Sequence, residues 1–133
     1  MIYIGSCLCG DVSFEVKGEI ENLYLCHCKY CQKDTGSAYA SNLFSTKAKL
    51  IWQTGENKVK TYQLPSTQHV KSFCSNCGSA VPSMQMNNEL VVVPAGCLNQ
   101  DIAIKPTAHI YKSSEAVWAK NLDKVKSYEQ LPE

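Results

Sequence analysis

The spacing of the cysteines constrains this chain more than any other feature of its sequence. Seven of the eight cysteines fall into a first pair, a triplet and a last pair. These groups contain Cys7 and Cys9; Cys26, Cys28 and Cys31; and Cys74 and Cys77. Alternate residues of an extended segment point to one side, and a tight turn brings the ends of a Cys-x-x-Cys pair together. Each group can therefore present two or more sulfurs to a single ion.

The expected compartment decides whether such cysteines bind metal or form disulfides. The first ten residues contain no basic residue and no apolar run of signal-peptide length, and the first lysine is Lys17. The apolar run at residues 90–93 is too short to span a membrane. We therefore expect a cytoplasmic protein, in which clustered cysteines bind metal more often than they form disulfides. Buried free thiols or disulfides are the alternative that the spacing leaves open.

Length and charge narrow the classes of partner. A chain of 133 residues has the size of one domain, so we expect a single domain over residues 1–133. Its 13 Lys and Arg against 12 Asp and Glu give a net charge of +1. This balance lacks the basic excess that is typical of nucleic-acid-binding proteins. We expect neither a nucleic-acid nor a membrane partner, and the sequence predicts no oligomeric state.

Alternation of apolar and polar residues predicts an all-β fold. In residues 11–17, Val12, Phe14 and Val16 alternate with polar neighbours, which is typical of a half-buried strand. Comparable runs between turn residues predict strands at residues 23–26, 38–44, 49–52, 58–64, 70–73, 80–84, 90–94 and 108–112. Many short strands favour an antiparallel β sandwich or open barrel with little helix. The helical expectations are a turn at residues 29–35, ended by Gly36, and a weak stretch at residues 114–121.

Seven cysteines suit two zinc ions, one with four ligands and one with three. A structural zinc has four protein ligands, whereas three protein ligands leave a coordination position open, as in catalytic sites. The simplest division keeps the triplet together and joins the two pairs into one closed site. A rival division joins the first pair to Cys26 and Cys28, and leaves Cys31 with the last pair. The spacing alone does not choose between them.

A further alternative gives the triplet a fourth protein ligand, which would make both zinc ions structural. Its candidates are the three histidines and the remaining cysteine, namely His27, His69, His109 and Cys97. His27 directly follows Cys26, so in an extended segment it points away from the two cysteines that flank it. We therefore expect His27 to be a spacer.

The order of these motifs resembles the glutathione-dependent formaldehyde-activating (GFA) family, also called the CENP-V/GFA domain. The resemblance runs from residues 5–10 through the triplet and the Gly36-Ser37 step to residues 73–79, with weaker matches at Gly96, residues 109–110 and Trp118. It implies an Mss4-like β fold held together by zinc. It also implies a structural zinc on Cys7, Cys9, Cys74 and Cys77, and a second zinc on Cys26, Cys28 and Cys31.

The resemblance implies carbon–sulfur bond chemistry as well, because the type member of the family adds glutathione to formaldehyde. A zinc ion with three thiolate ligands favours a soft fourth ligand, such as a substrate thiolate, over activation of water. We therefore hypothesise a zinc-dependent carbon–sulfur lyase that acts on a thiol–aldehyde adduct, with glutathione as a candidate thiol. The alternatives are a non-catalytic zinc-binding interaction module of Mss4-like fold and a sensor of thiols or metal.

Three further residues are candidates for contact with a substrate. Lys29 and Lys33 would share one helical face and could attract the carboxylates of glutathione, although a solvated surface is the alternative. Ser37 could hydrogen-bond a substrate oxygen or cap a turn. Cys97 is expected to pack as a small hydrophobic residue rather than to act as a thiol near the second zinc. The sequence shows no clear general base.

Overall fold

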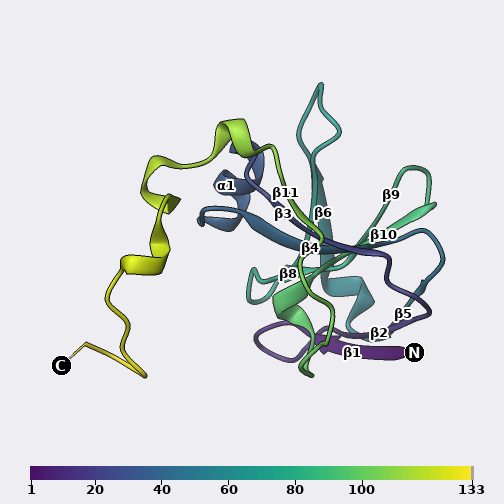
Figure 1. The fold of residues 1–133 in the computed structure, drawn as a ribbon. Helices are drawn as coiled ribbons and strands as arrows, with labels where there is room; N and C mark the ends of the chain where they lie inside the picture. Colours follow the sequence, from purple (N-terminus) through teal and green to yellow (C-terminus); the bar gives the residue numbers. More distant parts are fainter. Residues whose placement is uncertain (133) are drawn as a thin grey trace.

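The computed structural model describes residues 1–132, and these form three small sheets, one α-helix and several short 3₁₀ turns (Figure 1). The first sheet has the order β1-β2-β5 and consists of β1 (Ile2–Ser6), β2 (Ser13–Lys17) and β5 (Lys49–Thr54). The second has the order β11-β3-β4-β10-β9 and consists of β11 (Ala108–Ile110), β3 (Asn22–Cys26), β4 (Ala40–Ser45), β10 (Leu90–Pro94) and β9 (Ser83–Gln85). The third has the order β6-β7-β8 and consists of β6 (Val59–Gln63), β7 (Val70–Cys74) and β8 (Ala80–Val81). The predicted β fold with little helix is therefore confirmed.

Strand pairing follows the predicted antiparallel pattern with one exception. Neighbouring strands such as β1 and β2, or β3 and β4, run antiparallel. β11 instead pairs with β3 in parallel, with His109 opposite Leu25. A parallel neighbour needs a long connection, and here more than eighty residues separate the two strands, because β3 ends at Cys26 and β11 begins at Ala108.

Alternation along β2 explains how the main core forms. Phe14 and Val16 are fully buried, whereas Glu15 between them is only partly covered. The Phe14 ring packs edge-on against Trp52 of β5, with centroids 6.0 Å apart. Leu43 of β4 belongs to the same cluster. Burying side chains of this size contributes about 1.5–3 kcal/mol each, so this core joins the first sheet to the second.

Two strand predictions need correction. Residues 2–6 form β1, which the alternation does not predict, because apolar residues occupy both faces: Tyr3 is buried while Ile2 and Ile4 are half exposed. The single strand predicted at residues 80–84 is two strands, β8 and β9, with Pro82 between them. Proline lacks the N–H that a continuous ladder would use at that position.

Of the two helical predictions, the first is confirmed and the second needs correction. α1 (Lys29–Thr35) begins and ends where the sequence predicts, and Gly36 follows it with φ of 66°, the left-handed conformation that glycine tolerates best. Residues 114–121 contain no α-helix, and the region has the 3₁₀ turns Lys112–Ser114 and Val117–Ala119. Further 3₁₀ turns are Glu56–Lys58, Ala95–Cys97 and Leu122–Lys124. In Figure 1 the segment after β11 passes α1 and then runs away from the sheets.

Across residues 1–132, none of the helical segments has the length and apolar character needed to cross a membrane.

Candidate metal centres

The structure gathers the seven grouped cysteines into two clusters. One, the four-cysteine group, contains Cys7, Cys9, Cys74 and Cys77. The other, the three-cysteine group, contains Cys26, Cys28 and Cys31. Within each group the sulfur atoms all lie within 4.8 Å of one another. This arrangement is the simplest of the two divisions that the sequence allows, and the rival division does not match it.

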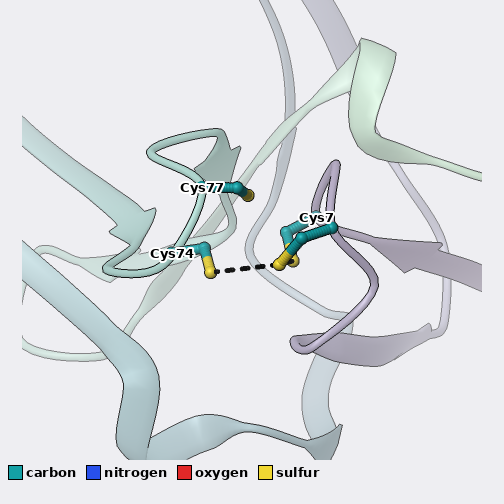
Figure 2. A group of neighbouring side chains, drawn as sticks. Cys7, Cys74 and Cys77 are labelled. Carbon is teal, nitrogen blue, oxygen red and sulfur yellow. Dashed lines mark hydrogen bonds between the residues drawn. The ribbon is translucent and has the colours of Figure 1, made fainter.

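The four-cysteine group joins two loops that are distant in the sequence. Cys7 lies in the turn after β1, while Cys74 ends β7 and Cys77 follows it in the next turn. Figure 2 shows the side chains of Cys7, Cys74 and Cys77 pointing into one space from these two loops. Gly78 closes the second turn with φ of 77°, and its N–H donates to the Cys74 carbonyl at 2.7 Å.

The sulfur positions of this group fit a tetrahedral zinc site. The sulfur of Cys9 lies 3.6 Å from that of Cys7 and 4.0 Å from that of Cys74. Four sulfurs placed tetrahedrally at the usual Zn–S distance would lie about 3.8 Å apart. The group could therefore hold zinc with a complete set of four protein ligands.

Polar groups around the four-cysteine group favour sulfur in its thiolate form. The N–H of Val12 donates to the sulfur of Cys7 at 3.3 Å, and Nδ2 of Asn76 donates to that of Cys9 at 3.3 Å. Hydrogen bonds from the side chain and backbone of Ser79 lower the pKa of Cys77 to about 5. Donors of this kind orient metal ligands and raise their affinity.

A charged pair lies beside the same group. Nζ of Lys58 is 2.9 Å from Oδ2 of Asp11, and the pKa of the lysine is raised, chiefly by that hydrogen bond and charge and also by Cys9 and Cys74. Asn76 donates to Asp11 as well, at 3.2 Å. Four thiolates on one divalent zinc carry a net charge of −2, so a neighbouring lysine is electrostatically favourable.

The three-cysteine group is built around the start of α1. Cys26 ends β3, Cys28 is the N-cap of the helix, and Cys31 lies in its first turn. The N–H of Cys31 donates to the sulfur of Cys28 at 3.2 Å, which fixes two of the three sulfurs to one helical turn. The loop between β3 and α1 is held by Gln32, whose Nε2 donates to the carbonyls of His27 and Ser114 at 2.7 and 3.0 Å.

Burial dominates the electrostatics of the three-cysteine group. Cys26 and Cys31 are buried, and loss of solvent is the main cause that raises the pKa of each. Thiols in such surroundings ionise only with a compensating positive charge. A divalent ion with an affinity for thiolate supplies that charge, so the donor set fits zinc.

Within residues 1–132, no fourth ligand atom joins the three sulfurs at that spacing. His27 is buried, and its Nε2 lies 2.8 Å from Nδ1 of His109. His69 hydrogen-bonds to Asp34. The sulfur of Cys97 donates to the Pro94 carbonyl at 3.0 Å. His27 is thus a spacer between two cysteines of the group.

A cavity of about 410 Å³ opens onto the three-cysteine group. All three cysteines line it, together with aromatic and polar residues from β4, β7 and the segments around them, including Tyr30, Phe44, Thr67, His69 and Tyr111. Cavities of roughly 300–1,000 Å³ hold small molecules. The group is therefore accessible to a ligand of that size.

The candidate substrate residues lie outside this cavity. Lys29 and Lys33 are one turn apart on α1, both exposed, and neither lines the cavity. Ser37 is exposed just beyond the end of the helix. Asp34 and His69 form a hydrogen-bonded pair near the group that the sequence does not predict. They lie 35 residues apart, and no local pattern connects them.

Cys97 lies apart from both groups. It packs against the core that contains Phe14 and Leu43, and burial raises the pKa of its thiol to about 12. The surroundings are those of a small packed residue.

A β domain with a four-cysteine group and a separate, accessible three-cysteine group has the ligand arrangement of small metal-binding β proteins. Within that class the relationship is specific. The family described as "Glutathione-dependent formaldehyde-activating enzyme" matches residues 2–114, and the chain belongs to this family. The family description suggests an enzyme, and the match contains all eight cysteines.

Comparison with solved structures shows a protein of similar fold. A crystal structure of a Rhodobacter sphaeroides protein from a structural genomics programme is similar to this chain, with a TM-score of 0.53 and 22% sequence identity. The similarity covers 75% of this chain and 91% of that one. At this identity the likeness concerns the fold alone. No curated protein matches the chain.

Proposed function

We propose that the protein is a zinc-dependent carbon–sulfur lyase that acts on an adduct of a small thiol and an aldehyde, with glutathione and formaldehyde as candidate components. The observation that carries the proposal is the access of the three-cysteine group to a cavity of small-molecule size. Family membership supports the same chemistry. Clustered cysteines bind metal more often than they form disulfides in reducing compartments, so the two cysteine groups support a location such as the cytoplasm.

The chain's own residues would divide the work. Cys26, Cys28 and Cys31 would hold the second zinc, and Cys7, Cys9, Cys74 and Cys77 the structural one. When bound by three thiolates, zinc supplies one further coordination position, which a soft sulfur ligand suits. The aromatic rings of Phe44 and Tyr111 line the cavity and would shield a bound adduct from water. Lys29, Lys33 and Ser37, which do not line the cavity, remain proposals for recognition of a thiol's polar groups.

The competing function is a non-catalytic interaction module in which both metal sites only stabilise the fold. The two functions differ in whether a small thiol reaches the three-cysteine group. A purely structural site needs no cavity of about 410 Å³ beside it.

Cobalt substitution separates the two functions. Thiolate ligands of Co²⁺ give charge-transfer bands, so we expect glutathione to change these bands in the wild type. Cys28→Ser should remove the response, and Cys97→Ser, which alters a thiol outside both groups, should keep it. Bands that stay constant through a glutathione titration, and through one with a smaller thiol, would favour the interaction module.

A further inference from the structure

A histidine–carboxylate pair lies beside the three-cysteine group and has no role in the proposal so far. Nε2 of His69 hydrogen-bonds to Oδ2 of Asp34, and the two side chains are only 20% and 24% exposed. On the other side of the carboxylate, Nζ of Lys71 lies 3.8 Å from Oδ1 of Asp34. The pair is therefore largely shielded from solvent, and the carboxylate of Asp34 lies between His69 and Lys71.

Helix geometry connects this pair to the cysteines. Asp34 follows Cys31 by three residues on α1, and residues at that spacing lie on one face of a helix. His69 lines the cavity onto which all three cysteines open. Asp34 and Lys71 line an adjoining cavity, which His69 and Cys31 share. The histidine thus lies between its carboxylate and the space that a ligand of the three-cysteine group would occupy.

The loop between β6 and β7 holds His69 in place. The N–H of His69 donates to Oγ1 of Thr67 at 3.1 Å, and its carbonyl accepts from the N–H of Leu64 at 3.0 Å. The Thr67 hydroxyl donates in turn to the Leu64 carbonyl at 2.8 Å. The ring lies 5.6 Å from the ring of Tyr30, centroid to centroid. Backbone bonds and ring packing together orient the imidazole.

The hydrogen bond to Asp34 also selects the tautomer. An ionised carboxylate only accepts, so Nε2 of His69 carries the proton of this bond, and in the neutral imidazole Nδ1 carries the lone pair. Within residues 1–132, no hydrogen bond joins Nδ1 to another group. A neutral imidazole with a free lone pair and a carboxylate behind it is the arrangement of a general base.

We propose that His69 is a catalytic residue of this site, the group that moves the proton when the carbon–sulfur bond forms or breaks, and that Asp34 is its positioning residue. This inference rests on the proposed function. It supplies the general base that the sequence does not reveal.

The proton and electron balance of the step is complete without another reactant. During adduct cleavage, Nδ1 of His69 takes the proton of the adduct hydroxyl. The O–H electron pair forms the second carbon–oxygen bond of the aldehyde, and the carbon–sulfur pair leaves on sulfur as thiolate. His69 then returns the proton to the released thiolate, which gives the free thiol and restores the neutral imidazole. The reverse sequence makes the adduct.

The alternative is a structural tie, in which Asp34, His69 and Lys71 only join α1 to β7. Kinetics and tautomer together decide between the two roles. The kinetic probe is exchange between ¹³C-formaldehyde and its glutathione adduct, followed by NMR with the zinc-loaded protein. We expect His69→Gln to lower the protein-dependent exchange rate by about a hundredfold or more. Asp34→Asn should lower it as well, and Asp101→Asn, an exposed carboxylate that lines neither cavity, should not.

Three results would overturn the assignment of His69, and they are distinguishable. A wild type that does not accelerate exchange contradicts the proposed function, and the base is rejected with it. A wild type that accelerates exchange beside a His69→Gln variant of equal rate rejects the base alone. The third readout is independent of activity: long-range ¹⁵N NMR should show the Nε2–H tautomer of His69, and an Nδ1–H tautomer rejects the base. Loss of thermal stability in His69→Gln without loss of rate is the result of a structural tie.

Discussion

The two cysteine groups use the same ligand chemistry in opposite surroundings. In the four-cysteine group, N–H and O–H donors surround the sulfurs, a lysine lies nearby, and the pKa of Cys77 is lowered. In the three-cysteine group, burial is the main influence, and it raises the pKa of Cys26 and Cys31. The surroundings of the four-cysteine group therefore favour negative charge on sulfur, whereas the three-cysteine group would need a bound ion to carry such charge.

The groups also differ in what they hold together. The four-cysteine group joins the turn after β1 to the turn after β7, two segments more than sixty residues apart. The three-cysteine group spans six residues of one continuous segment. A crosslink between distant segments restricts the unfolded chain much more than a local one. The first group can therefore serve the fold, while the second is free to serve a ligand.

The largest effect is expected when the four-cysteine group loses a ligand. Cys74 is fully buried, and structural zinc sites contribute about 10–16 kcal/mol to folding in small domains. That contribution is as large as the whole free energy of unfolding of a typical domain, about 5–15 kcal/mol. Cys74→Ser should therefore abolish the cooperative thermal transition measured by circular dichroism. A Cys74→Ser protein that melts like the wild type would remove the structural role from this group.

Acid should release metal from the two groups in order. A thiol with a raised pKa keeps its proton up to a higher pH, so protons compete with the ion at a higher pH there. Cys26 and Cys31 have raised pKa values and Cys77 has a lowered one. During a titration from pH 8 downward, we expect zinc to leave the three-cysteine group first. The measurement is zinc release to a colorimetric chelator together with circular dichroism, and the first release should leave the β signal intact. Release in a single step, or release that begins with loss of structure, would contradict the expected difference in acid sensitivity between the two groups.

A smaller change should follow from removing a donor near the four-cysteine group. Asn76 donates to both Cys9 and Asp11, and loss of such a partner usually lowers metal affinity about 10–100-fold. Asn76→Ala should weaken zinc binding by that amount at the four-cysteine group and leave the three-cysteine group unchanged. Competition with a chelator of known affinity measures both. Asn57→Ala, an exposed asparagine in a neighbouring 3₁₀ turn, is the matched control. An equal effect of both variants would argue against the hydrogen bond as the cause.

Cys97→Ser should have the smallest effect. The serine hydroxyl can keep the hydrogen bond to the Pro94 carbonyl, and the cost of placing it against the core should be about 1 kcal/mol. We expect the zinc content to equal that of the wild type, with a small decrease of the free energy of unfolding in urea. A lost equivalent of zinc would assign Cys97 to one of the groups instead.

Much of this arrangement follows from the sequence for identifiable physical reasons. Alternation predicts β2, a short apolar run between turn residues predicts β10, and the glycine after Thr35 predicts the end of α1. β1 escapes prediction because its exposed face is also apolar. The parallel pairing of β11 with β3 escapes because register between distant segments leaves no local pattern.

The candidate site shows the same division. Cysteine spacing predicts which residues group locally, such as the triplet around the start of α1. The joining of the first pair to the last pair depends on how the sheets pack, and the residues alone leave that choice open. The contact between Asp34 and His69 is a tertiary contact between α1 and the loop before β7, and it becomes visible only once the chain is folded.

The zinc content of Cys28→Ser shows whether the two cysteine groups are independent sites. If the two groups are separate sites with different tasks, this variant should bind one zinc ion per chain, against two in the wild type, and keep a cooperative thermal transition close to that of the wild type. A Cys28→Ser protein that binds two zinc ions, or that unfolds as its zinc is lost, would contradict the division into a site for the fold and a site for a ligand.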